Sequence, residues 1–525
     1  MLILHTIQRR AIQISLKVFL IGIASIIFCS CNSARSQEKT SSAKIGEWTP
    51  IKVNLLGANA NLISFNDPWN NKGLIEVTKK TQIKTLRYPG GTIGNYWDWD
   101  IGAVDRNVPD SLMIKWVVEN NHTESPDRYT IESLARMHQK TGIIPVFMLN
   151  MLSKDLEHSV RNLKKAESLG IPIRYIEMGN ELYFNIPFPL LKYPTPESYG
   201  ETCQTWISVL KKAFPQASFA VVGNYLERHP RQVDWNKRVL KNCKNADAIT
   251  IHAYSPSGLD GRLERKKIAP GSEGLGALKT ATRVGPKKLS ERQEWELQLL
   301  KDRKAYTNMF TTAEQNLKKM DNFYVPEEME LWVTEFNIRD DNSVVLHSWA
   351  QTLILSEYLF KFLEKDIQLS HMHNLAGNLF GMVHTDTLNY QHLESRKIKS
   401  VPYTLSSGGM ITKLFGEAMM GMEESALLNF DDAAFLIDDR GERFSTLKGC
   451  AFSNDHHKTA IVVNYGFEEQ EIALTGILDN SGSVASYASD PSAPVIGFKN
   501  IVVDTLDFAD TIKLSPHSIS IIKFQ

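Results

Sequence analysis

Two glutamates in the sequence stand at the ends of apolar, strand-like segments, where a side chain can reach a ligand. Glu181 follows Arg174-Tyr-Ile-Glu-Met-Gly-Asn180, and Glu335 follows Leu331-Trp-Val-Thr334. Such apolar segments are typical of strands that are covered on both faces. A pair of carboxyl groups suits acetal cleavage, because one can protonate the leaving oxygen while the other attacks the anomeric carbon. The alternative interpretation of Glu181 is a solvated residue in the first turn of a helix.

We predict that Glu181 is the acid/base and Glu335 the nucleophile, with carboxyl groups about 5 Å apart, as retention of configuration requires. Asn180 is expected to hold the hydroxyl group next to the reacting carbon. Tyr254 is expected to donate a hydrogen bond to Glu335 and keep it ionised. Surroundings of mixed polarity can then push the pKa values of the two glutamates apart.

Other polar side chains occur where further strand-like segments end. Arg87 precedes a Pro-Gly-Gly turn, and inside an apolar segment its charge requires a carboxylate partner. His252 and Tyr254 are two positions apart and share a face of their strand. The remaining predicted substrate-binding residues are Thr92, Trp97, Asn150, His373 and Asn374.

Two of these positions have alternative interpretations. Trp97 belongs to the aromatic cluster Tyr96-Trp-Asp-Trp99, which suits either stacking on a sugar face or packing within a loop. His371 and His373 share a strand face and are two candidate metal ligands. No third ligand has matching spacing, so we predict no metal and no cofactor.

The elements that must position these residues alternate between apolar strands and amphipathic helices, which predicts a (β/α)₈ barrel over residues 47–420. A doubly wound open sheet is the alternative, but the glycine-rich phosphate loop expected after its first strand is missing from the sequence. The predicted strands are Val53–Ala60, Thr85–Pro89, Ile144–Asn150, Arg174–Asn180, Ser218–Gly223, Ala248–Tyr254, Glu330–Asn337 and Leu369–Leu375.

Two regions depart from this alternation. Residues 255–329 form a long insertion, with a basic half, Arg262–Lys288, and a helical pattern over Ser290–Met320. An insertion of this length either shapes the site or is a surface excursion. Residues 421–525 contain short strands between turn residues, which predicts a C-terminal antiparallel β-sandwich.

The N-terminus has the pattern of a signal for export. Arg9 and Arg10 precede an apolar run that ends near Cys31, which predicts a signal peptide over residues 1–31 of the lipoprotein type, with Cys31 lipidated. Residues 32–46 are predicted to be a flexible tether. The expected location is the periplasm or the outer membrane through a lipid anchor, and ordinary secretion is the alternative.

The composition is that of a globular protein. The 525 residues include 42% hydrophobic and 22% charged residues, and 59 basic residues balance 59 acidic ones. Zero net charge gives no support for a nucleic-acid partner. An exported protein allows a disulfide between Cys203 and Cys243, but the wide spacing of these residues and Cys450 favours buried free thiols.

Taken together, the motifs resemble the retaining glycoside hydrolases of clan A. Met178-Gly-Asn-Glu181 is similar to the acid/base motif of the clan, and Val333-Thr-Glu-Phe-Asn337 to its nucleophile strand. Arg87-Tyr-Pro-Gly-Gly91, with Trp97 after it, resembles the α-L-arabinofuranosidases, as does His252-Ala-Tyr254. The resemblance implies a catalytic barrel followed by a β-sandwich, and a carbohydrate as substrate.

One position leaves the substrate open. Arabinofuranosidases usually have Asn after Pro-Gly-Gly, whereas Thr92 stands here and is closer to the heparanase-like β-glucuronidases. The leading hypothesis is a retaining hydrolase that cleaves a polysaccharide or its oligosaccharides by double displacement, most like an α-L-arabinofuranosidase. The alternatives are a heparanase-like β-glucuronidase and a non-catalytic carbohydrate-binding lipoprotein.

Overall fold

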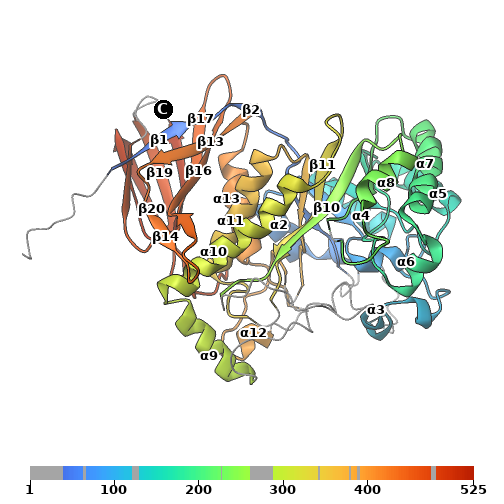
Figure 1. Cartoon of the computed structure of the whole chain (residues 1–525), viewed down its shortest axis with the longest axis horizontal. Helices are drawn as coiled ribbons and strands as arrows, with labels where there is room; N and C mark the ends of the chain where they lie inside the picture. Colours follow the sequence, from blue (N-terminus) through green and yellow to red (C-terminus); the bar gives the residue numbers. More distant parts are fainter. Residues whose placement is uncertain are drawn as a thin grey trace, which may run out of the picture.

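The computed structural model describes residues 40–524, except 63–66, 121–128, 226, 260–287, 341–342, 378–379, 387–390 and 474–480. Cys31, the predicted signal peptide and the basic half of the insertion except Lys288 lie outside the described residues. The described chain forms a barrel and a sheet-rich domain beside it (Figure 1). Among the described helices, none has the length and apolar character needed to cross a membrane.

In the described part of the chain, eight parallel strands close into a barrel, which confirms the predicted fold class and all eight predicted strands. The doubly wound alternative is wrong, because the last strand of the barrel pairs with the first through His371 and Gly57. The strands are β3 (Leu56–Asn59), β4 (Thr85–Tyr88), β7 (Ile144–Met148), β8 (Tyr175–Glu177), β9 (Ser218–Val222), β10 (Ala248–Ser255), β11 (Glu330–Ile338) and β12 (Leu369–Met372).

Helices surround the barrel, and local capping fixes where several of them begin. Thr195 and Ser198 form a capping box at the start of α7, with Pro196 in its first turn. The helical pattern predicted over Ser290–Met320 is divided, because Asp302 caps a new helix there. The helices are α2 (Lys72–Lys80), α3 (Lys115–Asn120), α4 (Ile131–Thr141), α5 (Leu156–Ser168), α6 (Pro187–Lys192), α7 (Pro196–Ala213), α8 (Trp235–Asn242), α9 (Leu289–Leu299), α10 (Arg303–Leu317), α11 (Trp349–Glu364), α12 (Gln391–Glu394) and α13 (Ser407–Ala418).

The C-terminal residues form the predicted sandwich, built from one folded sheet in the order β20-β19-β22-β17-β16-β13-β1-β18-β21. Its inner face holds an apolar cluster that includes Ala43, Val462 and Leu514. The strands are β1 (Ser41–Ile45), β2 (Thr49–Pro50), β13 (Glu424–Asp431), β16 (Leu447–Ser453), β17 (Lys458–Asn464), β18 (Gln470–Ala473), β19 (Ser481–Ala488), β20 (Val502–Ala509), β21 (Thr511–Leu514) and β22 (Ser518–Phe524). Small two-stranded sheets are β5 (Trp97–Asp98) with β6 (Ala103–Val104), and β14 (Phe435–Ile437) with β15 (Arg443–Ser445).

Strand β1 corrects one prediction. The tether predicted over residues 32–46 is wrong from Ser41 onward, because Ser41–Ile45 lies between β13 and β18 in the sheet. Its pairing with β18 is parallel, so the sandwich is not purely antiparallel. The chain therefore begins its described part in the C-terminal domain and then enters the barrel.

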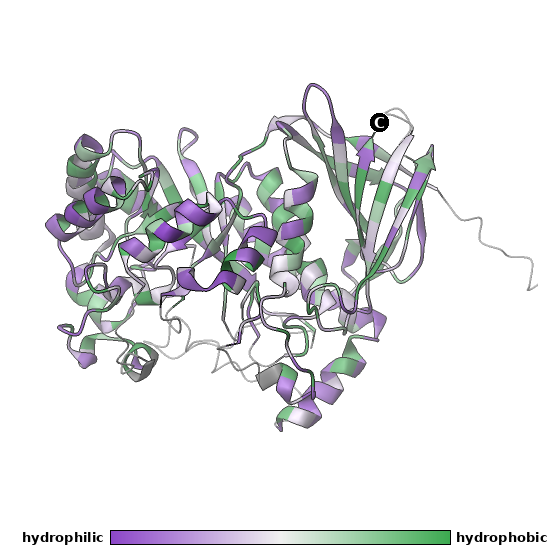
Figure 2. Cartoon of the chain, turned by 180° about the vertical axis from the view of Figure 1, so that it is seen from behind, coloured by the Kyte–Doolittle hydropathy of each residue, from purple (hydrophilic) through white to green (hydrophobic). Residues whose placement is uncertain are grey.

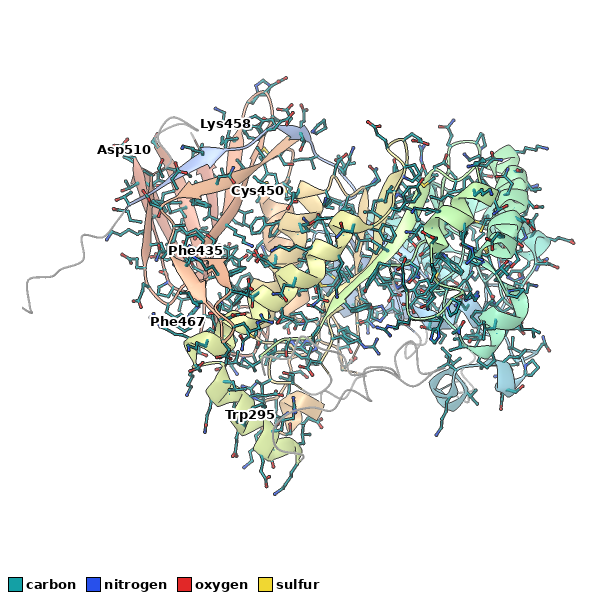
Figure 3. All side chains as sticks on the ribbon, in the orientation of Figure 1. Trp295, Phe435, Cys450, Lys458, Phe467 and Asp510 are labelled. Carbon is teal, nitrogen blue, oxygen red and sulfur yellow. The ribbon has the colours of Figure 1, made fainter. Side chains whose placement is uncertain are left out.

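The second face of the sheet packs on the barrel. Helices α10, α11 and α13 lie between the two domains (Figure 1). Helices α11 and α13 are mostly buried, and Figure 2 shows hydrophobic segments in green among polar ones in the helices between the barrel and the sheet. Cys450 and Phe452 of β16 belong to the same apolar cluster as the barrel helices. Figure 3 places Cys450 in the sheet. Cys203, Cys243 and Cys450 are all buried free thiols, as favoured from the sequence.

Candidate active site

Arg87 lies at the floor of the barrel mouth and connects the strand ends. It is fully buried, and its guanidinium donates five hydrogen bonds, which is every N–H that it has. Two go to Glu177, and one each goes to Asn59 (2.8 Å), Glu335 (2.9 Å) and Asn180 (2.8 Å). The carboxylate partner predicted for Arg87 is therefore present, and it is shared between two glutamates.

Glu181 lies on the loop that follows β8. Gly179 turns the chain with a φ of 95°, where a side chain would lie 2.7 Å from Leu182. Glu181 itself has a φ of 47°. Its Oε1 accepts a hydrogen bond from the Tyr183 hydroxyl at 3.1 Å. Arg231 donates to backbone carbonyls of this loop, including that of Leu182 at 2.8 Å, and so fixes its path.

Glu335 lies near the end of β11 and is 5% exposed. The Tyr254 hydroxyl donates to its Oε2 at 2.8 Å, as predicted, and Arg87 donates to its Oε1. Burial alone would raise the pKa of Glu335, but His252, His373, Arg87 and Tyr254 together lower it to about 2. Glu335 is thus held as a carboxylate, which is the form that a nucleophile needs.

His252 joins the two predicted catalytic groups. Its Nδ1 lies 3.0 Å from Oε1 of Glu181 and 3.6 Å from Oε2 of Glu335. Burial would lower the pKa of His252, but the two carboxyl groups raise it. The two glutamates, distant in the sequence, therefore meet at one side of the barrel mouth.

Three further predicted residues have buried polar atoms that lack a hydrogen-bond partner among the described residues. Asn180, which contacts Arg87, has none for its Nδ2, and Asn374, which follows His373 in the chain, has none for its Oδ1. His373 Nδ1 has none either and lies 3.6 Å from Glu335. Burial lowers the pKa of His373, so its ring is neutral near pH 7. Buried polar atoms without a partner are costly, so these atoms are suited to hydrogen-bonding a ligand.

Thr92, Trp97 and Asn150 are not part of the hydrogen-bond network described above. Among the described residues, Thr92 makes no hydrogen bond with either glutamate. Trp97 is 3% exposed and donates to the Tyr88 hydroxyl, which supports loop packing over sugar stacking. Asn150 donates to the Trp97 carbonyl at 3.0 Å and accepts from backbone N–H groups of its own loop. Trp97 and Asn150 therefore shape the loops around the site.

Sequence reasoning missed four polar residues at the site. Glu177 and Asn59 contact Arg87, Asn95 holds both backbone groups of Asn180, and Tyr183 contacts Glu181. Glu177 left a signal, since a carboxylate inside an apolar strand needs a buried partner just as Arg87 does.

In the described part of the chain, one group of possible metal ligands joins the β5 segment to α5. Asp98, Asp100 and His158 come within 4.8 Å of one another. Lys154 pairs with Asp98 at 2.6 Å and Arg161 with Asp100 at 2.5 Å, so these carboxylates already have cationic partners. His371 lies apart from this group, in contact with Thr85 at 3.1 Å.

Comparison with known proteins supports the predicted resemblance. No family model matches the sequence. The exo-α-(1→6)-L-arabinofuranosidase of Bifidobacterium longum is 23% identical over 202 residues, covering 35% of this chain and 37% of that relative. The matched region thus spans just over a third of the length of this relative.

Solved structures extend the likeness to the whole fold. A family 51 α-L-arabinofuranosidase from Bifidobacterium longum superposes with a TM-score of 0.62 at 14% identity, covering 93% of this chain and 100% of that one. The chain resembles the α-L-arabinofuranosidases. A 4-O-α-L-rhamnosyl-β-D-glucuronidase from Fusarium oxysporum has a TM-score of 0.53 at 13% identity, with 93% and 100% coverage. Both neighbours are glycoside hydrolases, and both share the fold of this chain.

Proposed function

We propose that this chain is a retaining glycoside hydrolase of the arabinofuranosidase type, with Glu181 as acid/base and Glu335 as nucleophile. The observation that carries the proposal is the single His252 nitrogen within 3.6 Å of both carboxyl groups. The two contacting oxygens can be no further apart than the sum of its two distances. That limit favours the separation of about 5–5.5 Å of retaining enzymes over the roughly 6.5–9.5 Å of inverting ones.

The proposed reaction has two displacements. The ionised Glu335 attacks the anomeric carbon while Glu181 protonates the glycosidic oxygen, so the aglycone leaves and a glycosyl ester forms on Glu335. Glu181, now a carboxylate, takes a proton from water, and that water attacks the same carbon and releases Glu335. The sugar leaves with its original anomeric configuration, and both carboxyl groups regain their starting states.

The test of Glu335 is its replacement by Ala, with the nitrophenyl glycoside of α-L-arabinofuranose as substrate. We expect Glu335→Ala to hydrolyse this substrate several orders of magnitude more slowly than the parent, since no glycosyl ester can form. Tyr324→Phe, at a half-exposed position on the barrel exterior, serves as the control and should keep full activity. Substrate depletion by the Glu335→Ala protein at the rate of the parent would contradict the proposed mechanism. A parent chain that hydrolyses no glycoside would instead favour the non-catalytic carbohydrate-binding protein.

The test of Glu181 uses the acidity of the leaving group. Glu181→Ala should lose most activity on mononitrophenyl glycosides but far less on dinitrophenyl glycosides, because a good leaving group needs no proton. Added azide should restore turnover and give a glycosyl azide of retained configuration. Equal losses on both aryl substrates would contradict the acid/base assignment.

A heparanase-like β-glucuronidase is the second candidate, favoured by Thr92 after Pro-Gly-Gly and by the structural likeness to a glucuronidase. A panel of aryl α-L-arabinofuranosides and aryl β-D-glucuronides separates the two. Higher kcat/KM on the glucuronides would replace the sugar assignment while leaving both glutamates in their roles.

A further inference from the structure

The proposed catalytic groups do not account for Glu177, which is as deeply buried as any residue at the site. Its side chain is 0% exposed and faces the barrel interior from β8, next to Arg87 of β4. Both of its oxygens accept hydrogen bonds from Arg87, and Oε1 also accepts one from the Thr334 hydroxyl at 2.9 Å. Such hydrogen bonds offset the cost of removing the carboxylate of Glu177 from water.

The bidentate contact fixes the plane and direction of the guanidinium. Because Glu177 takes the Nε and one Nη2 donor, the remaining donors must point toward Glu335, Asn59 and Asn180. Glu335 is the proposed nucleophile, and Asn180 is expected to hold a substrate hydroxyl. The orientation of both groups therefore depends on a residue that reaches neither of them.

The charge of Glu177 has a second effect. Arg87 is one of the cations that lower the pKa of Glu335. Without a second carboxylate, the full charge of Arg87 would act on Glu335. The pKa of Glu335 would fall further, and its carboxylate would be a weaker nucleophile. Glu177 offsets part of that charge, so Glu335 stays ionised and still remains able to attack.

We propose that Glu177 is a positioning residue of this site: it orients Arg87 and offsets its charge, and so sets the nucleophilicity of Glu335. The inference rests on the proposed function. It adds a third carboxylate, at the end of the strand that leads to the acid/base, to a reaction that needs two.

The test is Glu177→Gln, which keeps the shape of the side chain but removes its charge and turns one acceptor into a donor facing Arg87. We expect kcat/KM on the nitrophenyl α-L-arabinofuranoside to fall about 100-fold, as for a misplaced reacting group. The inhibition constant for free L-arabinose should change much less, because kcat/KM depends on the transition state of bond cleavage, whereas the inhibition constant reports ground-state binding alone. Glu177→Asp keeps the charge and should recover part of the loss.

Glu357→Gln is the matched control, because it neutralises another buried carboxylate that pairs with a cation, Lys448, outside the site. It should lower the thermal midpoint without changing kcat/KM measured well below that midpoint. A folded Glu177→Gln protein with the parent's kcat/KM would overturn the inference.

A second variant covers poor folding of Glu177→Gln. Thr334→Val removes only the hydroxyl that contacts Glu177, and it should lower kcat/KM severalfold while the inhibition constant stays near the parent value. Unchanged kcat/KM in Thr334→Val would then overturn the inference. If the parent chain cleaves none of the aryl glycosides, the proposed function fails first and this inference fails with it.

Discussion

His252 links the two proposed catalytic carboxyl groups through one ring nitrogen, so its charge acts on both. After burial, which acts in the opposite direction, His252 is the largest influence on the pKa of Glu335 and helps to lower it to about 2. Since the two glutamates in turn raise the pKa of His252, the imidazolium persists to higher pH than in an isolated histidine. Glu335 and His252 therefore each stabilise the ionised form of the other.

Replacing His252 by Gln should raise the pKa of Glu335, because a neighbouring cation is lost. The acid limb of the kcat/KM profile should then move to higher pH, since protonated Glu335 cannot attack. His371→Gln is the control: burial and Arg87 lower the pKa of His371 to about 3, so its ring is neutral over most of the assay range. If the acid limb of His252→Gln is unchanged, or moves to lower pH, His252 does not lower the pKa of Glu335.

At the scale of elements, the loop after β8 depends on an arginine from a neighbouring loop. Arg231 is buried and donates to the carbonyl groups of Leu182, Phe184 and Tyr193, all in the segment that follows Glu181. Its guanidinium also lies over the ring of Trp235, 5.0 Å from the centroid. The planar fork is needed here, because one ammonium group cannot reach three separate carbonyl groups.

We therefore expect Arg231→Lys to lower kcat/KM by about 100-fold through displacement of Glu181. The loss should be smaller on dinitrophenyl substrates, which need little protonation. Arg238→Lys is the matched control, because Arg238 makes a forked ion pair with Glu197 on the outside of the barrel. Equal kcat/KM values in the two variants would show that the loop holds its position without Arg231.

The sequence predicted those parts of the fold that local patterns determine. The barrel strands are continuous apolar runs, and the residues at their ends, including Glu181 and Glu335, lie at one mouth because all the strands are parallel. The pairing of Arg87 with Glu177 depends on register between strands, which no single segment encodes. Strand β1 has the polar sequence Ser-Ser-Ala-Lys-Ile and becomes a strand through its partners. The Asp302 cap, in contrast, could have been recognised beforehand.

At the scale of the whole molecule, β1 ties the N-terminal end of the described chain to the C-terminal domain. It fills the place between β13 and β18, and Ala43 is 1% exposed in the inner core. A chain that begins at Glu47 should therefore unfold at a lower temperature than one that begins at Thr40, because two strand edges lose their partner. Differential scanning calorimetry of both chains tests this, and equal midpoints would show that β1 adds no stability.

The contact between the two domains includes a buried charge cluster. Lys448 of β16 reaches Glu314 of α10 at 2.8 Å and also pairs with Glu357 of α11, which is 4% exposed. Burial raises the pKa of Glu357, although Lys448 acts in the opposite direction. The ion pair of Lys448 and Glu357 therefore stabilises the contact between the barrel and the sandwich only while both side chains are charged.

Lys448→Met should destabilise the protein by about 3 kcal/mol at pH 7, because the Glu357 carboxylate stays buried without its cation. Loss of Lys448 also raises the pKa of Glu357 further above its unfolded value. As the pH falls through that raised pKa, the folded state takes up a proton and the penalty disappears, so the deficit should shrink between pH 7 and pH 5. The double variant Lys448→Met with Glu357→Gln should recover most of the stability at pH 7 without this pH dependence. Urea unfolding of the three proteins at both pH values measures these terms, and a deficit in Lys448→Met that is equal at both pH values would mean that lost packing, not the stranded charge, causes it.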